Sequence, residues 1–132
     1  MVRGAGRCAA AEGQLGRLST HVLDQTQGRP APDVAVDLHV LDADGAWRAL
    51  KQVRTNADGR TDRPLLSGAD FKVGTYMLTF HLGDYFRRAG AALSDPPFLD
   101  LVPLRFAIAE PDGHYHVPLL ATPWSYATYR GS

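Results

Sequence analysis

The chain has 132 residues, of which 45% are hydrophobic and 21% charged, and its 14 basic residues balance its 14 acidic residues. This length suits one domain with one core, and the balanced charge and apolar content exclude both a fully disordered chain and a surface that attracts nucleic acid. The only cysteine, Cys8, cannot form an internal disulfide, so we expect a protein of the reducing cytoplasm.

Residues 1–17 are small and polar, and we expect them to form a disordered N-terminal extension ahead of one domain over residues 18–132. They lack the apolar run of roughly 7 to 15 residues that a secretory signal needs. No later stretch approaches the ~20 apolar residues of a membrane span. We therefore expect no contact with a membrane.

The first half of the domain has the two-residue period of half-buried strands. Residues 18–24 (LSTHVLD) and 34–41 (VAVDLHVL) place apolar side chains on one side of an extended chain. A turn at residues 42–45 (DADG) leads into a strand at 46–55, which a second Asp-Gly turn at 56–59 (NADG) closes. Two such hairpin signals indicate an antiparallel β protein.

The second half continues this pattern with one interruption. Residues 74–83 (GTYMLTFHLG) alternate again, and a short helix is expected from Tyr85 to Leu93 with Asp84 at its N-cap. Three further runs complete a set of about eight strands: 98–109, 114–121 and 125–131. Short strands separated by turns usually pack as two sheets, so the sequence predicts an all-β fold, a two-sheet antiparallel β-sandwich with one short helix.

The histidines differ in what their strands imply. His39 and His81 lie opposite the apolar faces of their strands, so we expect both to point to solvent. His114 and His116 share one face of a strand, which is either a polar outer surface or a site. His21 is either a hydrogen-bonded structural histidine or a functional one.

Two kinds of chemistry would use these side chains. His114 and His116, with a third imidazole such as His21, have a geometry that one metal ion accepts, but no carboxylate or cysteine with ligand spacing accompanies them. Acid and base catalysis is the other, because imidazole exchanges its proton near neutral pH. Arg60, after the second turn, is either a solvated charge or a planar donor for a carboxylate, an oxyanion or a cyclic imide.

Five motifs occur together in the order and spacing of one family. They are LSTHVLDQTQGRPAPDV, TNADGRT, GDYF, HYHVPLL and the terminal YRGS. In these motifs the chain resembles the 5-hydroxyisourate hydrolases, also called transthyretin-related proteins, over about residues 18 to 132. The terminal YRGS distinguishes such hydrolases from the hormone-carrying transthyretins, which share the fold.

The resemblance implies a transthyretin-like sandwich assembled as a homotetramer, a dimer of dimers, with active sites in the channel between the dimers. The implied reaction is hydrolysis of 5-hydroxyisourate to 2-oxo-4-hydroxy-4-carboxy-5-ureidoimidazoline in urate degradation, with no metal or organic cofactor. Matched motif by motif, the site residues would be His21, Arg60, His116, Tyr129 and Ser132.

The chemistry of these residue types suggests their roles. His21 or His116 would take a proton from the attacking water and return one to the leaving nitrogen, and the choice between them stays open. Arg60 would stabilise the oxyanion, Tyr129 would hold the heterocycle, and Ser132 with the terminal carboxylate would orient a histidine or a water. The alternative is a carrier that binds a small aromatic ligand without chemistry, although a carrier channel favours apolar walls with few polar groups.

Overall fold

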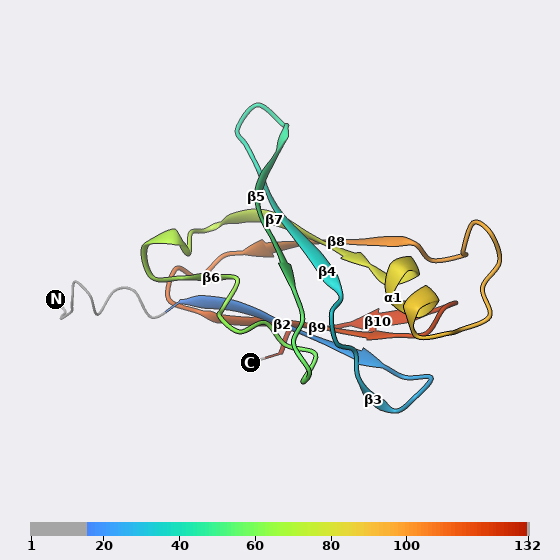
Figure 1. Cartoon of the computed structure of the whole chain (residues 1–132). Coiled ribbons are helices and arrows are strands. Elements are labelled where there is room, and N and C mark those ends of the chain that lie inside the picture. The colour runs from blue at the N-terminus through green and yellow to red at the C-terminus, as the bar shows by residue number, and fades with distance from the viewer. Residues whose placement is uncertain (1–15, 132) are drawn as a thin grey trace, which may run out of the picture.

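The computed structural model of this chain describes residues 16–131. It consists of two β-sheets packed face to face, with one short α-helix at the end of strand β7 (Gly74–His81) (Figure 1). One sheet has five strands in the order β10-β9-β2-β3, with β6 also pairing with β2, and the other has four strands in the order β5-β4-β7-β8. The all-β sandwich predicted from the sequence is confirmed. Residues 1–15 of the expected extension lie outside the described residues, and the first described strand, β2, begins at Arg17.

The five-stranded sheet is formed by β2 (Arg17–Asp24), β3 (Arg29–Pro30), β6 (Leu66–Ser67), β9 (His114–Ala121) and β10 (Tyr126–Thr128). Its central pair, β2 and β9, is parallel over eight positions, from Arg17 opposite His114 to Asp24 opposite Ala121. The antiparallel arrangement expected throughout is therefore wrong for this pair. Hairpin signals fix only strands that are close in sequence, and these two strands are separated by most of the chain.

The four-stranded sheet is formed by β4 (Ala35–Leu41), β5 (Trp47–Arg54), β7 (Gly74–His81) and β8 (Leu101–Ile108). Every neighbouring pair in this sheet is antiparallel, as predicted. Apolar side chains from both sheets meet between them and form one core, in which Leu18, Leu38, Phe80 and Leu119 are fully buried. The alternation of the strands leaves the other half of their side chains on the outer faces.

The helix α1 (Leu82–Arg88) begins and ends earlier than the sequence indicated. Asp84 is not its N-cap: the backbone N–H groups of Leu82 and Gly83 donate to the carbonyl of Asp100 at 2.9 and 3.1 Å, so a side-chain cap is unnecessary. Asp84 pairs instead with Arg87 at 3.0 Å. Within residues 16–131, no helix is long and apolar enough to cross a membrane.

His39 and His81 lie on the outer face of the four-stranded sheet, as expected, but both are half-buried. His81 Nε2 lies 2.8 Å from Asp37 Oδ2. His39 Nδ1 is shielded from solvent and has no hydrogen-bond partner within the described residues. Side chains on neighbouring strands cover one another on this face, which a period of two along one strand cannot show.

Candidate active site

The two predicted site histidines come from the adjacent parallel strands β2 and β9. In β2 the side chains of Leu18 and Val22 enter the core, so His21 faces outward, and in β9 burial of Tyr115 leaves His116 on the same outer face. The two imidazole rings have their centroids 6.5 Å apart and are tilted by 43°. The pairing of the strands thus brings together two imidazoles that come from near the two ends of the domain sequence.

Arg60 reaches this face because its turn docks on β2. The N–H of Val22 donates to the carbonyl of Gly59 at 2.8 Å, and His21 and Arg60 form an isolated antiparallel bridge. Gly59 has a positive φ of 75°, and a Cβ there would lie 2.4 Å from the carbonyl oxygen of Val22, so only glycine fits. Asn56 Oδ1 accepts the N–H groups of Asp58 and Arg60 and holds the turn in shape.

A hydrogen bond fixes the tautomer of His21. Its Nε2 lies 2.8 Å from the backbone carbonyl oxygen of Asp58, and a carbonyl only accepts. The proton of the neutral ring must therefore lie on Nε2, which leaves a lone pair on Nδ1. That nitrogen is the one able to take a proton from water.

His116 is held by a side chain of β2 and by the end of the chain. Ser19 Oγ lies 2.8 Å from His116 Nδ1, and the N–H of Gly131 donates to the carbonyl of His116 at 2.6 Å. The last described residue therefore folds back onto the histidine strand. Ser132, the remaining predicted site residue, lies outside the described residues.

The surroundings of both imidazoles favour the neutral form by lowering their pKa. Burial lowers the pKa of His21 below its ordinary value, and the nearby positive charge of Arg60 lowers it further. Burial also lowers the pKa of His116, again helped by Arg60 and then by His21. Within residues 16–131 the Arg60 guanidinium makes no hydrogen bond or ion pair, so its donors are available to a ligand. The arrangement combines two imidazoles of lowered pKa with one planar cation.

A cavity of about 350 Å³ lies over this face and is lined by Arg17, Ser19, Arg60, His114, Tyr115 and His116. Arg17 and Ser19 were not predicted as site residues, although the period of β2 places them on the same face as His21. His114 was left between an outer surface and a site, and the structure brings it to the cavity. His21 is not among the lining residues and adjoins the cavity through its contact with His116.

Tyr129 lies apart from this cavity. The last strand ends at Thr128, earlier than the predicted 131, and the Tyr129 side chain is 61% exposed. It lines a different cavity of about 300 Å³, next to β8 and together with Arg130. Arg130 stacks on Tyr115 with its Cζ 4.0 Å from the ring centroid and donates to Glu110 at 3.2 Å.

No group of three or more histidine, cysteine, aspartate or glutamate side chains within residues 16–131 is placed to hold a metal ion. His114, His116 and His21 therefore do not lie together as a set of three metal ligands. The described part of the site offers imidazole and guanidinium groups together with the hydroxyl groups of Ser19 and Tyr115.

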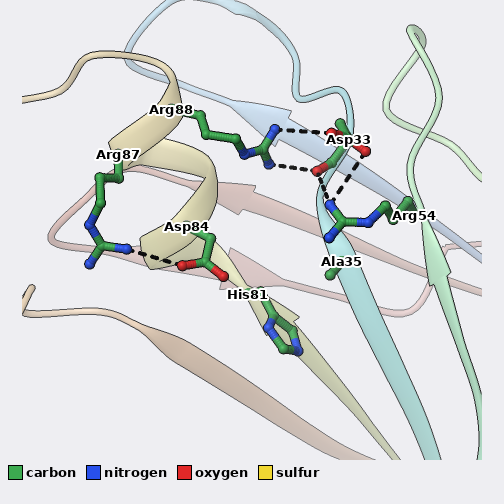
Figure 2. Close-up of a pocket in the computed structure, with 7 residues that line it drawn as sticks. All are labelled: Asp33, Ala35, Arg54, His81, Asp84, Arg87 and Arg88. Carbon is green, nitrogen blue, oxygen red and sulfur yellow. Dashed lines mark hydrogen bonds and ion pairs between the residues drawn. The ribbon is translucent and has the colours of Figure 1, made fainter.

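A larger cavity, about 500 Å³, lies beside α1 and has a different character. Figure 2 shows that Arg54 and Arg88 both bond to Asp33, and that Arg87 bonds to Asp84. Each of its arginines thus pairs with a carboxylate, whereas Arg60 has no carboxylate partner among residues 16–131. We therefore assign the candidate active site to the smaller cavity.

Comparison with known proteins shows the family of the chain. A sequence model described as the HIUase/Transthyretin family matches residues 18–131. The chain is 60% identical over 117 residues to a Rhizobium meliloti protein named 5-hydroxyisourate hydrolase 2, covering 89% of this chain and 97% of that protein.

Two solved structures extend the comparison. An (S)-allantoin synthase superposes with a TM-score of 0.85 at 48% identity over 90% of this chain, which spans 44% of the length of that chain. Sea bream transthyretin in complex with thyroxine superposes with a TM-score of 0.78 at 31% identity, over 87% of this chain and 94% of that one. The fold is thus transthyretin-like, and the chain belongs to the HIUase/Transthyretin family.

Proposed function

We propose that this protein hydrolyses 5-hydroxyisourate to 2-oxo-4-hydroxy-4-carboxy-5-ureidoimidazoline, a step of urate degradation. The observation that carries this proposal is the convergence of His21, His116 and Arg60 on one outer face, where burial and Arg60 lower the pKa of both imidazoles. The 60% identity to a protein named 5-hydroxyisourate hydrolase 2 supports this substrate over an aromatic ligand that is carried unchanged. A carrier site would need apolar walls, and this cavity is lined mainly by polar and charged side chains.

The fixed tautomer of His21 makes this residue the base, and His116 then acts as the acid. His21 Nδ1, the nitrogen with the lone pair, takes a proton from water as the water oxygen attacks the ring carbonyl carbon. The carbonyl π electrons move onto oxygen, and the Arg60 guanidinium stabilises this oxyanion. When the intermediate collapses, the C–N bond breaks and its electron pair goes to nitrogen. His116 gives that nitrogen the proton that water lost to His21 and that His21 has passed on to it, so both imidazoles end neutral. Acid and base catalysis of this kind contributes about 10² to 10⁴-fold, and one oxyanion donor about 3 kcal/mol.

We propose further that Tyr129 and Ser132 complete the site in a homotetramer, a dimer of dimers. Large apolar side chains are exposed on the strand edges and the C-terminal segment, as expected of surfaces that other subunits cover: Leu101, Trp124, Tyr126 and Tyr129. An exposed Tyr129 would then hold substrate at such an interface. Residues 18–132 would form the hydrolase domain, and the single cysteine supports a cytoplasmic location.

The experiment is a spectroscopic assay. Urate oxidase generates 5-hydroxyisourate in the cuvette, and the decay of its ultraviolet band is followed with and without the protein; an unchanged decay rate would contradict the proposal. Alanine at His21, Arg60 or His116 should lower turnover by at least ~10²-fold with the oligomer intact. His39→Ala, on the other sheet, is the matched control and should leave turnover unchanged.

A further inference from the structure

Ser19 lies directly opposite His116 in the parallel pair of β2 and β9. Its Oγ is 2.8 Å from His116 Nδ1, both side chains are half-buried, and both line the cavity that holds Arg60. A strand places a side chain more reproducibly than a loop does, so this hydroxyl is held at a fixed position relative to the imidazole.

A second contact covers the opposite edge of the same ring. A Cβ added to Gly131 would lie 2.9 Å from His116 Cδ2, so the C-terminal backbone passes close over that edge. Nδ1 and Cδ2 are the two ring atoms bonded to Cγ. Ser19 contacts Nδ1 and Gly131 lies beside Cδ2, so these two residues leave the far end of the ring uncovered. Nε2 lies at that far end. The two contacts thus set the ring plane and leave Nε2 as the nitrogen available to substrate.

The kind of partner matters as much as its position. A hydroxyl both donates and accepts, so Ser19 can accept a hydrogen bond from the Nδ1–H group while Nε2 holds a lone pair. It can equally donate to Nδ1 while Nε2 carries the proton. The carbonyl that bonds to His21 permits only one of these states for a neutral ring. His116 can therefore lose or gain a proton at Nε2 without losing its partner.

We propose that Ser19 is a positioning residue for proton transfer, which orients the His116 imidazole through Nδ1 and supports it in both protonation states of Nε2. This inference rests on the proposed hydrolase function and adds a residue to that site. Ser19 acts through His116 and need not contact the substrate. Its removal should therefore affect the chemical step more than binding.

The test compares Ser19→Ala, Ser19→Thr and the control Ser94→Ala, whose hydroxyl donates to a loop carbonyl. Ser19→Ala should lower kcat by about 10-fold or more with KM within ~3-fold, because a misplaced catalytic group costs up to about 10² per Å. Ser19→Thr keeps a hydroxyl and suits a strand, so kcat should return close to that of the unchanged protein. Ser94→Ala should have no effect.

A second measurement does not depend on turnover. In protein labelled with ¹⁵N-histidine, the Nδ1 and Nε2 shifts of His116 report its tautomers, and Ser19→Ala alone should change them. Unchanged shifts, an unchanged kcat, or a loss of kcat that threonine does not reverse would each overturn the role of Ser19. A chain that fails to accelerate 5-hydroxyisourate decay would instead contradict the proposed function, while the shifts would still test the Ser19 contact.

Discussion

Replacing Gly131 with alanine should slow hydrolysis by displacing His116 while the sandwich stays folded. The new Cβ would lie 2.9 Å from His116 Cδ2, whereas ordinary contacts begin at 3.4 Å. The backbone of Gly131 is tied to His116 by a hydrogen bond of 2.6 Å, so the ring must move by the difference, about 0.5 Å. A misplacement of 1 Å can cost about 10²-fold, so half of it should lower kcat about tenfold, or about 1.4 kcal/mol.

The matched control for this change is Gly74→Ala at the start of β7. A Cβ at Gly74 meets only Tyr76 Cε1 at 3.7 Å, an ordinary contact, so its kcat should stay within ~2-fold of the unchanged protein. Both variants are assayed on 5-hydroxyisourate generated in place, with circular dichroism and size-exclusion chromatography as checks on folding and assembly. An unchanged kcat in Gly131→Ala, or equal losses in the two variants, would refute the reasoning.

Two further changes test the electrostatics of the site and of the core. Arg60→Gln removes a positive charge that lowers the pKa of His21 and His116, so both pKa values should rise. The acid limb of the kcat/KM profile should therefore move to higher pH. An unmoved limb would contradict the placement of Arg60. Tyr85→Phe removes an O–H that donates to the buried carboxylate of Asp24 at 2.7 Å, and should cost about 1.5 to 3 kcal/mol in urea denaturation with kcat unchanged. A loss below ~0.5 kcal/mol would mean that water replaces the hydroxyl.

The strands were predictable because their period is a local property of the sequence. The expected run at residues 114–121 coincides with β9, and the expected run at 34–41 differs from β4 by one residue. The helix was misplaced because its start depends on the carbonyl of Asp100, which lies far along the chain. A cap from a distant backbone group leaves no mark in the neighbouring residues, whereas Asp84 is a strong but unused local signal.

His21, Arg60 and His116 were predictable one by one as candidate site residues, and their arrangement was not. Alternation correctly placed His116 on the face opposite Tyr115, and the family motifs pointed to His21 and Arg60. That the two histidines meet depends on the parallel pairing of β2 with β9, for which the sequence offers no hairpin. Ser19 escaped notice for the same reason, because its partner is 97 residues away.

The same sandwich can serve a carrier or a hydrolase, and the difference lies in what three separate segments bring to one face. The Asp-Gly turn brings Arg60 to His21, β2 brings a hydroxyl to His116, and the chain end passes over the other edge of that ring. The core contributes none of these contacts, so substitutions at these points should impair proton transfer well before they unfold the protein. A carrier has no need of a fixed tautomer, whereas a hydrolase depends on it, because water must lose its proton to one defined lone pair.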